Sequence, residues 1–323
     1  MSSASSIGAA WPPVSASFER MRGFYDHTVI ETGEDVATFL DTYQQVTDDF
    51  ANQEALTRLS IRFVAQSRQL RILEASGVSL EGAIPLANTP GLVLAYAGQN
   101  KPERTVQEQH MQTHLQNIQT VVDTPHLSHH HEVSFTRGVI SPNTPEAVRT
   151  QLEPHFLDLY GIFGYGPSEV HELLANPANT IMYAERDGQI ISTAMAEHAS
   201  ILIGRLGTLN LVEITEASTR PEYRRQGLYA AVSGLLVQQV LAEGIPGGIH
   251  AIYGESNAGM PGVMHAAVQN GRRFAVQDRD VYNLQNPHFG ILPQNVYVHD
   301  GQETRRYNDF AVSYVPQTTG ETT

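Results

Sequence analysis

The sequence contains no cysteine, and this absence excludes disulfides, thiolate catalysis and cysteine-based zinc sites. It contains a single lysine, Lys101, and no apolar run approaches the roughly 20 residues that a membrane helix requires. The stretch up to Met21 lacks the basic start and apolar core of a secretory signal. We therefore expect a cytoplasmic protein with no membrane partner.

Basic residues are scarce, with 20 Lys and Arg against 34 Asp and Glu, and the net charge is −14. Such a chain repels the phosphates of nucleic acids, whose binding depends on clustered Lys and Arg. We therefore expect no nucleic-acid partner. An acidic field attracts protonated amines, but acidity also serves solubility, and both interpretations stay open.

The length of 323 residues allows one large or two ordinary domains. Apolar residues recur every three or four positions through 34–75, without Gly or Pro, and again through 103–122, which predicts helices. From residue 132 the pattern changes to alternating strands and helices. The chain is accordingly divided into a disordered leader (1–25), a mostly helical region of unknown role (26–130), an α+β domain (131–316) and a C-terminal tail (317–323).

The expected order after residue 132 is a strand, two helices, three strands, a helix, a strand, a helix and further strands. Asp187-Gly188 lies between two strand patterns, and this pair is a strong hairpin signal. A long strand at 209–219 is followed by a helix at 228–243. This order predicts an α+β fold with a mixed, mainly antiparallel sheet flanked by helices.

The residues between that strand and that helix, 221–229, read Pro-Glu-Tyr-Arg-Arg-Gln-Gly-Leu-Tyr. A helix N-terminus presents unpaired N–H groups and a partial positive charge, which suit a pyrophosphate. Gly227 allows the backbone to approach a phosphate, and Arg224 and Arg225 add positive charge. The segment is therefore a candidate phosphate-binding loop; the alternative is a surface turn with two solvated arginines.

This segment resembles the cofactor motif of the GNAT superfamily of acetyl-CoA-dependent N-acetyltransferases, Arg/Gln-x-x-Gly-x-Gly/Ala, which follows the fourth strand. The resemblance extends over roughly residues 132–315. It implies acetyl-CoA as a co-substrate and no metal. The cofactor-binding residues that it implies are Thr219, Arg224, Arg225, Gln226, Gly227, Leu228, Tyr229, Ala230 and Asn257. Tyr229 departs from the motif, since the family prefers Gly or Ala there, and this departure shifts the expected phosphate contact toward Ala230.

Two acids on the strand 209–219, Glu213 and Glu216, are the candidate catalytic residues. A protonated amine must lose a proton before it attacks a thioester, and the family often uses a carboxylate on this strand as the base. The resemblance implies a bulge here that brings both acids near the cleft, and it favours Glu213, which lies an even number of positions from Thr219. Alternatively, one acid faces solvent and the other pairs with an arginine.

The tyrosine that often protonates the leaving thiolate in this family is absent, because Ala267 stands at its position. His265 and Tyr253 are weak substitutes. The resemblance implies an N-acetyltransferase acting on the amine of a small molecule or amino acid. A non-catalytic acetyl-CoA-binding module and a longer-chain N-acyltransferase remain alternatives, and a homodimer is left open.

Two further segments have open interpretations. The aromatic and glycine-rich run at 159–166 is either a wall of the acceptor site or ordinary core packing. The histidines His129, His130 and His131 lie in an expected linker, where adjacent side chains rarely converge on one ion. We therefore expect no metal site.

Overall fold

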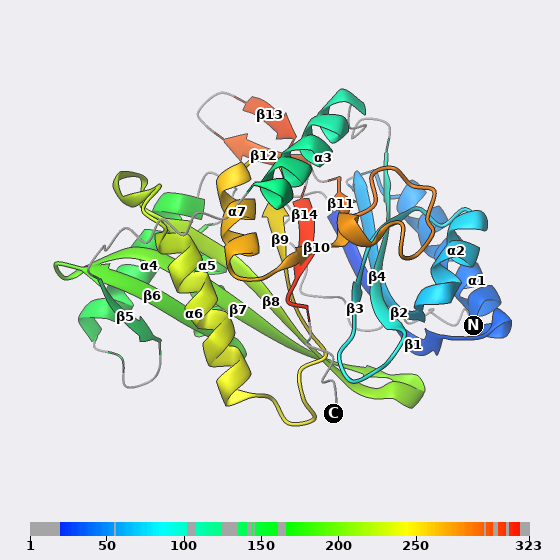
Figure 1. Cartoon of the computed structure of the whole chain (residues 1–323), viewed down its shortest axis with the longest axis horizontal. Helices are drawn as coiled ribbons and strands as arrows, with labels where there is room; N and C mark the ends of the chain where they lie inside the picture. The colour runs from blue at the N-terminus through cyan, green and yellow to red at the C-terminus, as the bar shows by residue number, and fades with distance from the viewer. Residues whose placement is uncertain are drawn as a thin grey trace.

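The computed structural model describes residues 20–54, 56–101, 108–124, 135–140, 144, 146–160, 166–293, 295–299, 303–307 and 310–316. The histidine cluster, the tail at 317–323 and most of the run at 159–166 lie outside these residues. The described chain contains two large sheets with helices on their outer faces (Figure 1). No helix among the described residues is long and apolar enough to cross a membrane.

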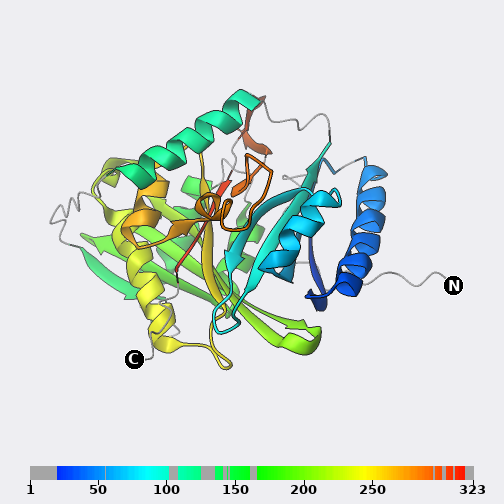
Figure 2. The same cartoon turned by 45° about the vertical axis from the view of Figure 1, so that its right-hand side comes forward.

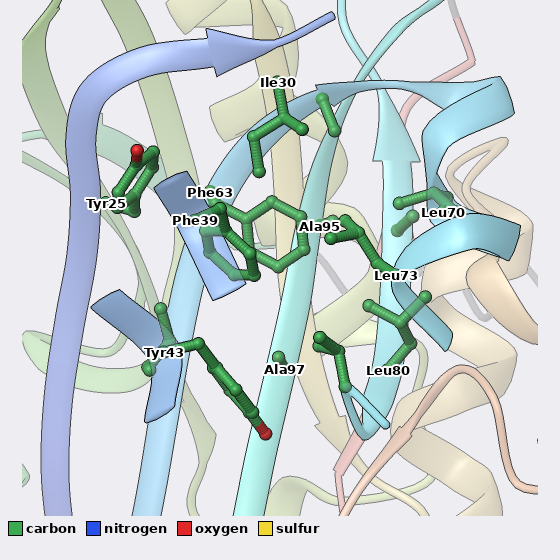
Figure 3. Close-up of a cluster of buried hydrophobic side chains, with 14 of the residues drawn as sticks. Tyr25, Ile30, Phe39, Tyr43, Phe63, Leu70, Leu73, Leu80, Ala95 and Ala97 are labelled. Carbon is green, nitrogen blue, oxygen red and sulfur yellow. The ribbon is translucent and has the colours of Figure 1, made fainter. Parts of the chain in front are cut away.

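The N-terminal sheet has the strand order β1-β2-β4-β3. Its strands and helices are β1 (Arg20–Ile30), α1 (Gly33–Ala51), β2 (Arg58–Gln66), α2 (Ser67–Ala75), β3 (Leu80–Pro85) and β4 (Leu92–Asn100). Both helices cover one face of the sheet, and Figure 3 shows Phe39 of α1 and Leu70 of α2 pointing toward Phe63 and Ala95 on the strands. Burying each large apolar side chain contributes about 1.5–3 kcal/mol, so this layer stabilises the sheet.

The prediction of a mostly helical region at 26–130 is wrong, because four strands lie in it or begin just before it. The helical pattern predicted over 34–75 covers two helices, α1 and α2, and the strand β2 between them. In β2 the apolar Leu59, Ile61 and Phe63 alternate with polar residues, the period of a strand. Almost every residue of β2 is buried, the polar Arg58, Ser60 and Arg62 included, so both faces of this strand are covered. β1 begins at Arg20, inside the expected leader 1–25.

The C-terminal sheet has the order β10-β14-β9-β8-β7-β6-β5, with β11 paired to β14. Its strands are β5 (Thr136–Val139), β6 (Asn179–Arg186), β7 (Gln189–Ile203), β8 (Gly207–Thr219), β9 (Ala251–Asn257), β10 (Arg273–Phe274), β11 (Ile291–Leu292) and β14 (Phe310–Tyr314). Apart from the parallel pair β8 and β9, the described pairings in this sheet are antiparallel. The predicted order of elements and the mixed, mainly antiparallel α+β fold are confirmed.

Helices cover both faces of this sheet. The helices are α3 (Glu108–Asp123), α4 (Glu146–Tyr160), α5 (Pro167–Ala175), α6 (Leu228–Glu243) and α7 (Pro261–Gln269), and a separate hairpin joins β12 (Asn295–His299) to β13 (Glu303–Tyr307). α4 and α5 pack on one face, and α6 packs on the other through Val232 and Leu236. α3 lies over α7, away from α1 and α2 (Figure 2). The last helix of the region 26–130 therefore packs on the region 131–316.

The two sheets also pack against each other and share one core. Phe24, Val64 and Tyr96 of the N-terminal sheet meet Leu211 and Tyr253 of the C-terminal sheet in one buried cluster. The layers are α1 and α2, the N-terminal sheet, the C-terminal sheet, and α6 and α7 (Figure 2). Each sheet therefore needs the other to bury this face.

The N-terminal sheet repeats the topology of half of the C-terminal sheet. The elements β1-α1-β2-α2-β3-β4 give the order β1-β2-β4-β3, and β8-α6-β9-α7-β10-β14 give the order β8-β9-β14-β10. In both units the first two strands are parallel and the other pairs are antiparallel. The sequence had not indicated this internal repeat.

Candidate active site

The parallel strands β8 and β9 separate partway along their length. They pair only at Leu211 with Ala251, Val212 with Ile252 and Glu213 with Tyr253. Beyond that point β8 continues with β7, and β9 continues with β14. The separation leaves a V-shaped gap in the ladder whose vertex lies just after the third of these pairs. Backbone polar groups on the two inner edges are there available to an extended ligand.

The gap begins beside a β-bulge on β8. The register with β7 shifts between the pairs Thr193–Ser218 and Met195–Thr215, where β8 carries one residue more than β7. Glu216 lies in this bulge with a φ of 42°, a left-handed conformation rare for non-glycine residues. The bulge that the GNAT resemblance implies is therefore present, and it re-aims the chain beside the two candidate acids.

The bulge changes which face Thr219 occupies. Six positions separate it from Glu213, but the extra residue makes the spacing odd within the pleat. The Thr219 hydroxyl contacts Ser192 Oγ at 3.0 Å, whereas Glu213 contacts groups of the opposite face. The prediction that Glu213 and Thr219 share a face, because an even number of positions separates them, is therefore wrong. Glu213 and Thr219 lie on opposite sides of the strand.

The candidate phosphate loop joins β8 to α6. Arg224 and Arg225 are exposed, and Arg224 Nε donates to Thr219 O at 3.1 Å. Gly227 is the N-cap of α6 with a φ of 71°, and Arg225 has a φ of 63°. A helix leaves its first N–H groups without intrahelical partners, so the N–H groups of the first turn, 228–230, face this loop. The predicted residues thus form one basic, anion-compatible helix start.

Three of the remaining predicted cofactor residues lie in this loop or at the start of α6, whereas Asn257 lies on β9. Gln226 Nε2 donates to Glu222 O at 3.4 Å, Leu228 is buried, and Tyr229 is partly buried. Asn257 ends β9, and its side-chain oxygen accepts from the Gly259 N–H at 2.9 Å. Asn257 thus lies at the far end of the strand that borders the gap, with its amide oxygen engaged in a local turn.

A cluster of charged side chains lies under the bulge, between the two sheets. Tyr253 Oη donates to Glu213 Oε2 at 2.8 Å and accepts from Arg62 Nη1 at 2.7 Å. Arg62 also pairs with Glu255 at 2.7 Å and lies 3.6 Å from Glu213. Arg22 reaches Glu255 at 3.4 Å. The expected alternative, in which one acid pairs with an arginine, therefore describes Glu213, and the arginine comes from the N-terminal sheet.

A third acid joins Glu213 and Glu216. Glu197 of β7 lies directly opposite Glu213 in the antiparallel register. Burial, together with repulsion from these two acids, raises the pKa of Glu197 to about 8. Sequence reasoning missed Glu197, because strand register cannot be read from the residues of one strand. The available signal was an acid directly after the largely apolar stretch 190–196.

The raised pKa of Glu197 makes stability depend on pH. The folded state retains a proton that the unfolded state releases between pH 4.5 and about 8, so stability falls as pH rises through this window. Glu197→Gln is always neutral, and its free energy of unfolding should fall less than that of the wild type over this window. Urea unfolding at about pH 5 and about pH 8 measures the difference. Equal changes in both proteins would contradict the assignment.

A neutral histidine lies on the same face, beyond the bulge. His155 Nε2 lies 2.8 Å from Ser218 Oγ, which also lies 2.7 Å from Thr193 Oγ1. Burial, followed by the charge of Arg220, lowers the pKa of His155 to about 4. His155 is therefore uncharged at neutral pH and adds no positive charge beside the acids.

Ala267 occupies the position where the family often has a tyrosine acid, so this position offers no hydroxyl group. Ala267 is buried in α7 against an apolar cluster. Tyr253 lies on the face of the sheet toward Arg62, where its hydroxyl is already bound to Arg62 and Glu213. Burial raises the pKa of Tyr253, which makes its proton harder to release. Tyr253 therefore fits the charged cluster better than the role of a proton donor.

No protein-family model and no curated protein matches the chain. Among solved structures, the chain is similar to Arabidopsis thaliana NAA60 in complex with a bisubstrate analogue, with TM-score 0.40, 15% identity, and coverage of 56% of this chain and 100% of that chain. It is also similar to an acetyltransferase of the GNAT family from Streptococcus pneumoniae, with TM-score 0.38, 10% identity, and coverage of 56% and 98%. Arabidopsis thaliana NAA60 in complex with acetyl-CoA is similar at TM-score 0.39 and 14% identity, with coverage of 56% and 97%.

Proposed function

We propose that the chain is an acetyl-CoA-dependent N-acyltransferase that acts on an amine. One observation carries the proposal, namely that three features lie along the single strand β8. The strand separates from its parallel neighbour β9, it has a β-bulge beside a group of carboxylates, and a basic loop connects it to helix α6, whose N-cap is a glycine. Strand β8 thus places three candidate sites close together: a gap for an extended acyl carrier, a binding site for the phosphates of that carrier, and a base.

The cofactor side is supported by the fit of the loop and the gap to a phosphate-bearing carrier. The N–H groups of the first turn of α6 suit the pyrophosphate, and Gly227 keeps a side chain away from it. A Cβ on Gly254 would stand 2.8 Å from Ile214 O, so only glycine allows the strands this approach at the vertex. Acetyl-CoA, when bound, supplies the activated acyl group. The loop binds and orients it.

The acceptor side is supported by the charge balance beneath the bulge. The cluster brings together Glu197, Glu213, Glu216 and Glu255 against two guanidinium groups, those of Arg22 and Arg62. The excess of acid favours a cationic amine over an anion. Arg62 and Tyr253 hold Glu213 in place, and Glu197 has a pKa near neutrality, which suits a group that accepts a proton from the amine.

Thiol release from acetyl-CoA across a panel of small amines, amino acids and peptides tests this function. We expect turnover with at least one cationic amine, and none with the corresponding alcohol. The same panel with longer acyl-CoA donors measures chain-length preference. Tight binding of coenzyme A without turnover on any amine would favour a non-catalytic binding module.

A further inference from the structure

Arg272 lies immediately after the end of α7, and its side chain enters the protein interior. Gly271 ends the helix with a φ of 73°, and the Arg272 N–H donates back to Ala267 O at 3.0 Å. This turn directs the chain into β10. Arg272 is only 4% exposed, which is unusual for an arginine.

The guanidinium of Arg272 lies at the vertex of the gap between β8 and β9. Its Nη1 lies 2.7 Å from the point where a Cβ on Gly254 would stand, and Ile214 O lies 2.8 Å from the same point. Ile214 and Gly254 are the first residues after the last β8–β9 pair. A Cβ on Gly254 would point to the same face as Ile252, which packs with α6, and away from the face of Tyr253, so Arg272 lies on the face of the sheet where the phosphate loop begins. The charged cluster with Arg62 occupies the other face.

The described residues supply no charge that balances Arg272. Its Nε and Nη2 are buried without a hydrogen-bond partner, and within the described residues no carboxylate pairs with it. Burial lowers the pKa of Arg272, while the nearby Tyr229 acts in the opposite direction. An isolated buried charge costs several kcal/mol, and an apolar side chain would pack there at less cost. The vertex is therefore built to receive a group that accepts hydrogen bonds or carries negative charge.

We infer that Arg272 stabilises the thiolate of coenzyme A as it leaves the acyl group. The inference rests on the proposed function. In that reaction the amine nitrogen forms a bond to the thioester carbonyl carbon, the C–S bond breaks, and its electron pair stays on sulfur. The amine proton passes to the carboxylate cluster. The sulfur is protonated from solvent, and Arg272 donates hydrogen bonds to it before that step.

The position of Arg272 favours the thiolate over the pyrophosphate. The exposed Arg224 and Arg225 already serve the outer end of the gap, at the start of α6. Arg272 lies at its inner end, close to the strand that carries the carboxylates. Ala267, at the place of the usual tyrosine acid, is a close neighbour of Arg272 through the backbone hydrogen bond.

The ionisation of bound coenzyme A tests this role without an acceptor. The ultraviolet absorbance of the thiolate, followed against pH with saturating protein, gives the pKa of the bound thiol. A cation within about 4–6 Å lowers the pKa of an anion-forming group by roughly 1–3 units, so we expect a shift of at least one unit in the wild type. Arg272→Met should remove the shift, and Arg272→Lys should keep part of it. Arg279→Met, at an exposed pair with Asp280, is the control.

The outcomes separate the two proposals. If the wild type does not bind coenzyme A, the proposed function fails. If it binds coenzyme A with an ordinary thiol pKa, or if Arg272→Met keeps the lowered value, only the role of Arg272 is overturned. A preference of the wild type for succinyl-CoA over acetyl-CoA that disappears in Arg272→Met would also overturn it, because the guanidinium would then bind an acyl carboxylate. Arg272→Met removes an unbalanced charge, so we expect it to fold, as thermal unfolding can verify.

Discussion

Gly227→Val is expected to abolish the binding of coenzyme A. Gly227 starts α6 with a φ of 71°, in the left-handed region that a β-branched residue adopts only under strain of about 1–3 kcal/mol. Relief of that strain would turn the N–H groups of the first turn away from the phosphate. If the backbone held instead, the valine side chain would stand against the ligand. Either way we expect calorimetric affinity to fall by on the order of a hundredfold or more, which corresponds to roughly 3 kcal/mol.

Gly188→Val is the matched control for this prediction. Gly188 has a φ of 78° in the β6–β7 hairpin, and a Cβ there would meet nothing within 4 Å. The substitution therefore carries similar backbone strain away from the loop, and coenzyme A affinity should be unchanged. Arg225→Ala should weaken binding more mildly, because it removes one exposed charge. Unchanged affinity in Gly227→Val would sink the assignment of the phosphate loop.

Removing the base is expected to lower turnover by at least about a hundredfold, since general bases contribute roughly 10²–10⁴ in rate. Glu213→Gln, Glu216→Gln and Glu197→Gln each remove one carboxylate of the cluster and keep a similar side-chain volume. The variant that removes the proton acceptor should lose turnover and keep its affinity for coenzyme A. Raising the pH should partly rescue it, because solvent then supplies more of the neutral amine.

Glu34→Gln is the control for the carboxylate variants. Glu34 is exposed in the first turn of α1, on the outer layer of the N-terminal sheet, so its loss should not change turnover. Initial rates against pH, measured for the four variants and the wild type with the best amine of the panel, make the comparison. If the three cluster variants keep both their rates and the wild-type pH profile, the base lies elsewhere or the amine arrives neutral.

The C-terminal part of the site was accessible from the sequence because its signals are local. The loop at 221–229 joins a strand to a helix within a few residues, and Gly227 and the two arginines are visible there without knowledge of the fold. The order of elements follows from turns such as Asp187-Gly188, which close hairpins between neighbours in sequence. The predicted bulge is confirmed. The sequence did not predict that the bulge places Thr219 on the opposite face of β8 from Glu213.

The rest depended on contacts between residues distant in sequence. Arg62 and Glu213 are 151 positions apart (213 minus 62), and only the packing of the two sheets brings them together. The register of β7 and β8 places Glu197 opposite Glu213, and this neighbour helps to raise the pKa of Glu197. The role of Arg272 was not predicted, because the residue type alone does not distinguish a buried arginine from a solvated one. Strand β2 was missed although its alternation is present, because apolar residues also recur in α1 and α2 on either side of it and the whole stretch was assigned to one helical pattern.

Because the topology is repeated, the molecule contains two helices, α1 and α6, that each follow the first strand of a unit. The residues at their N-termini carry opposite charge. Where β8 meets α6 the chain carries arginines, whereas β1 meets α1 at Glu31, Thr32 and Asp35, and Asp35 Oδ2 accepts from the Thr32 N–H at 2.8 Å. The first unit thus caps its own helix and repels a phosphate, and it contributes a sheet face and Arg62 instead. A fragment cut at residue 131 would keep the whole phosphate loop, yet it would lose Arg62 and expose Tyr253 to water. The boundary at residue 131 that the sequence suggested is therefore not one at which the chain can be divided without breaking the candidate site.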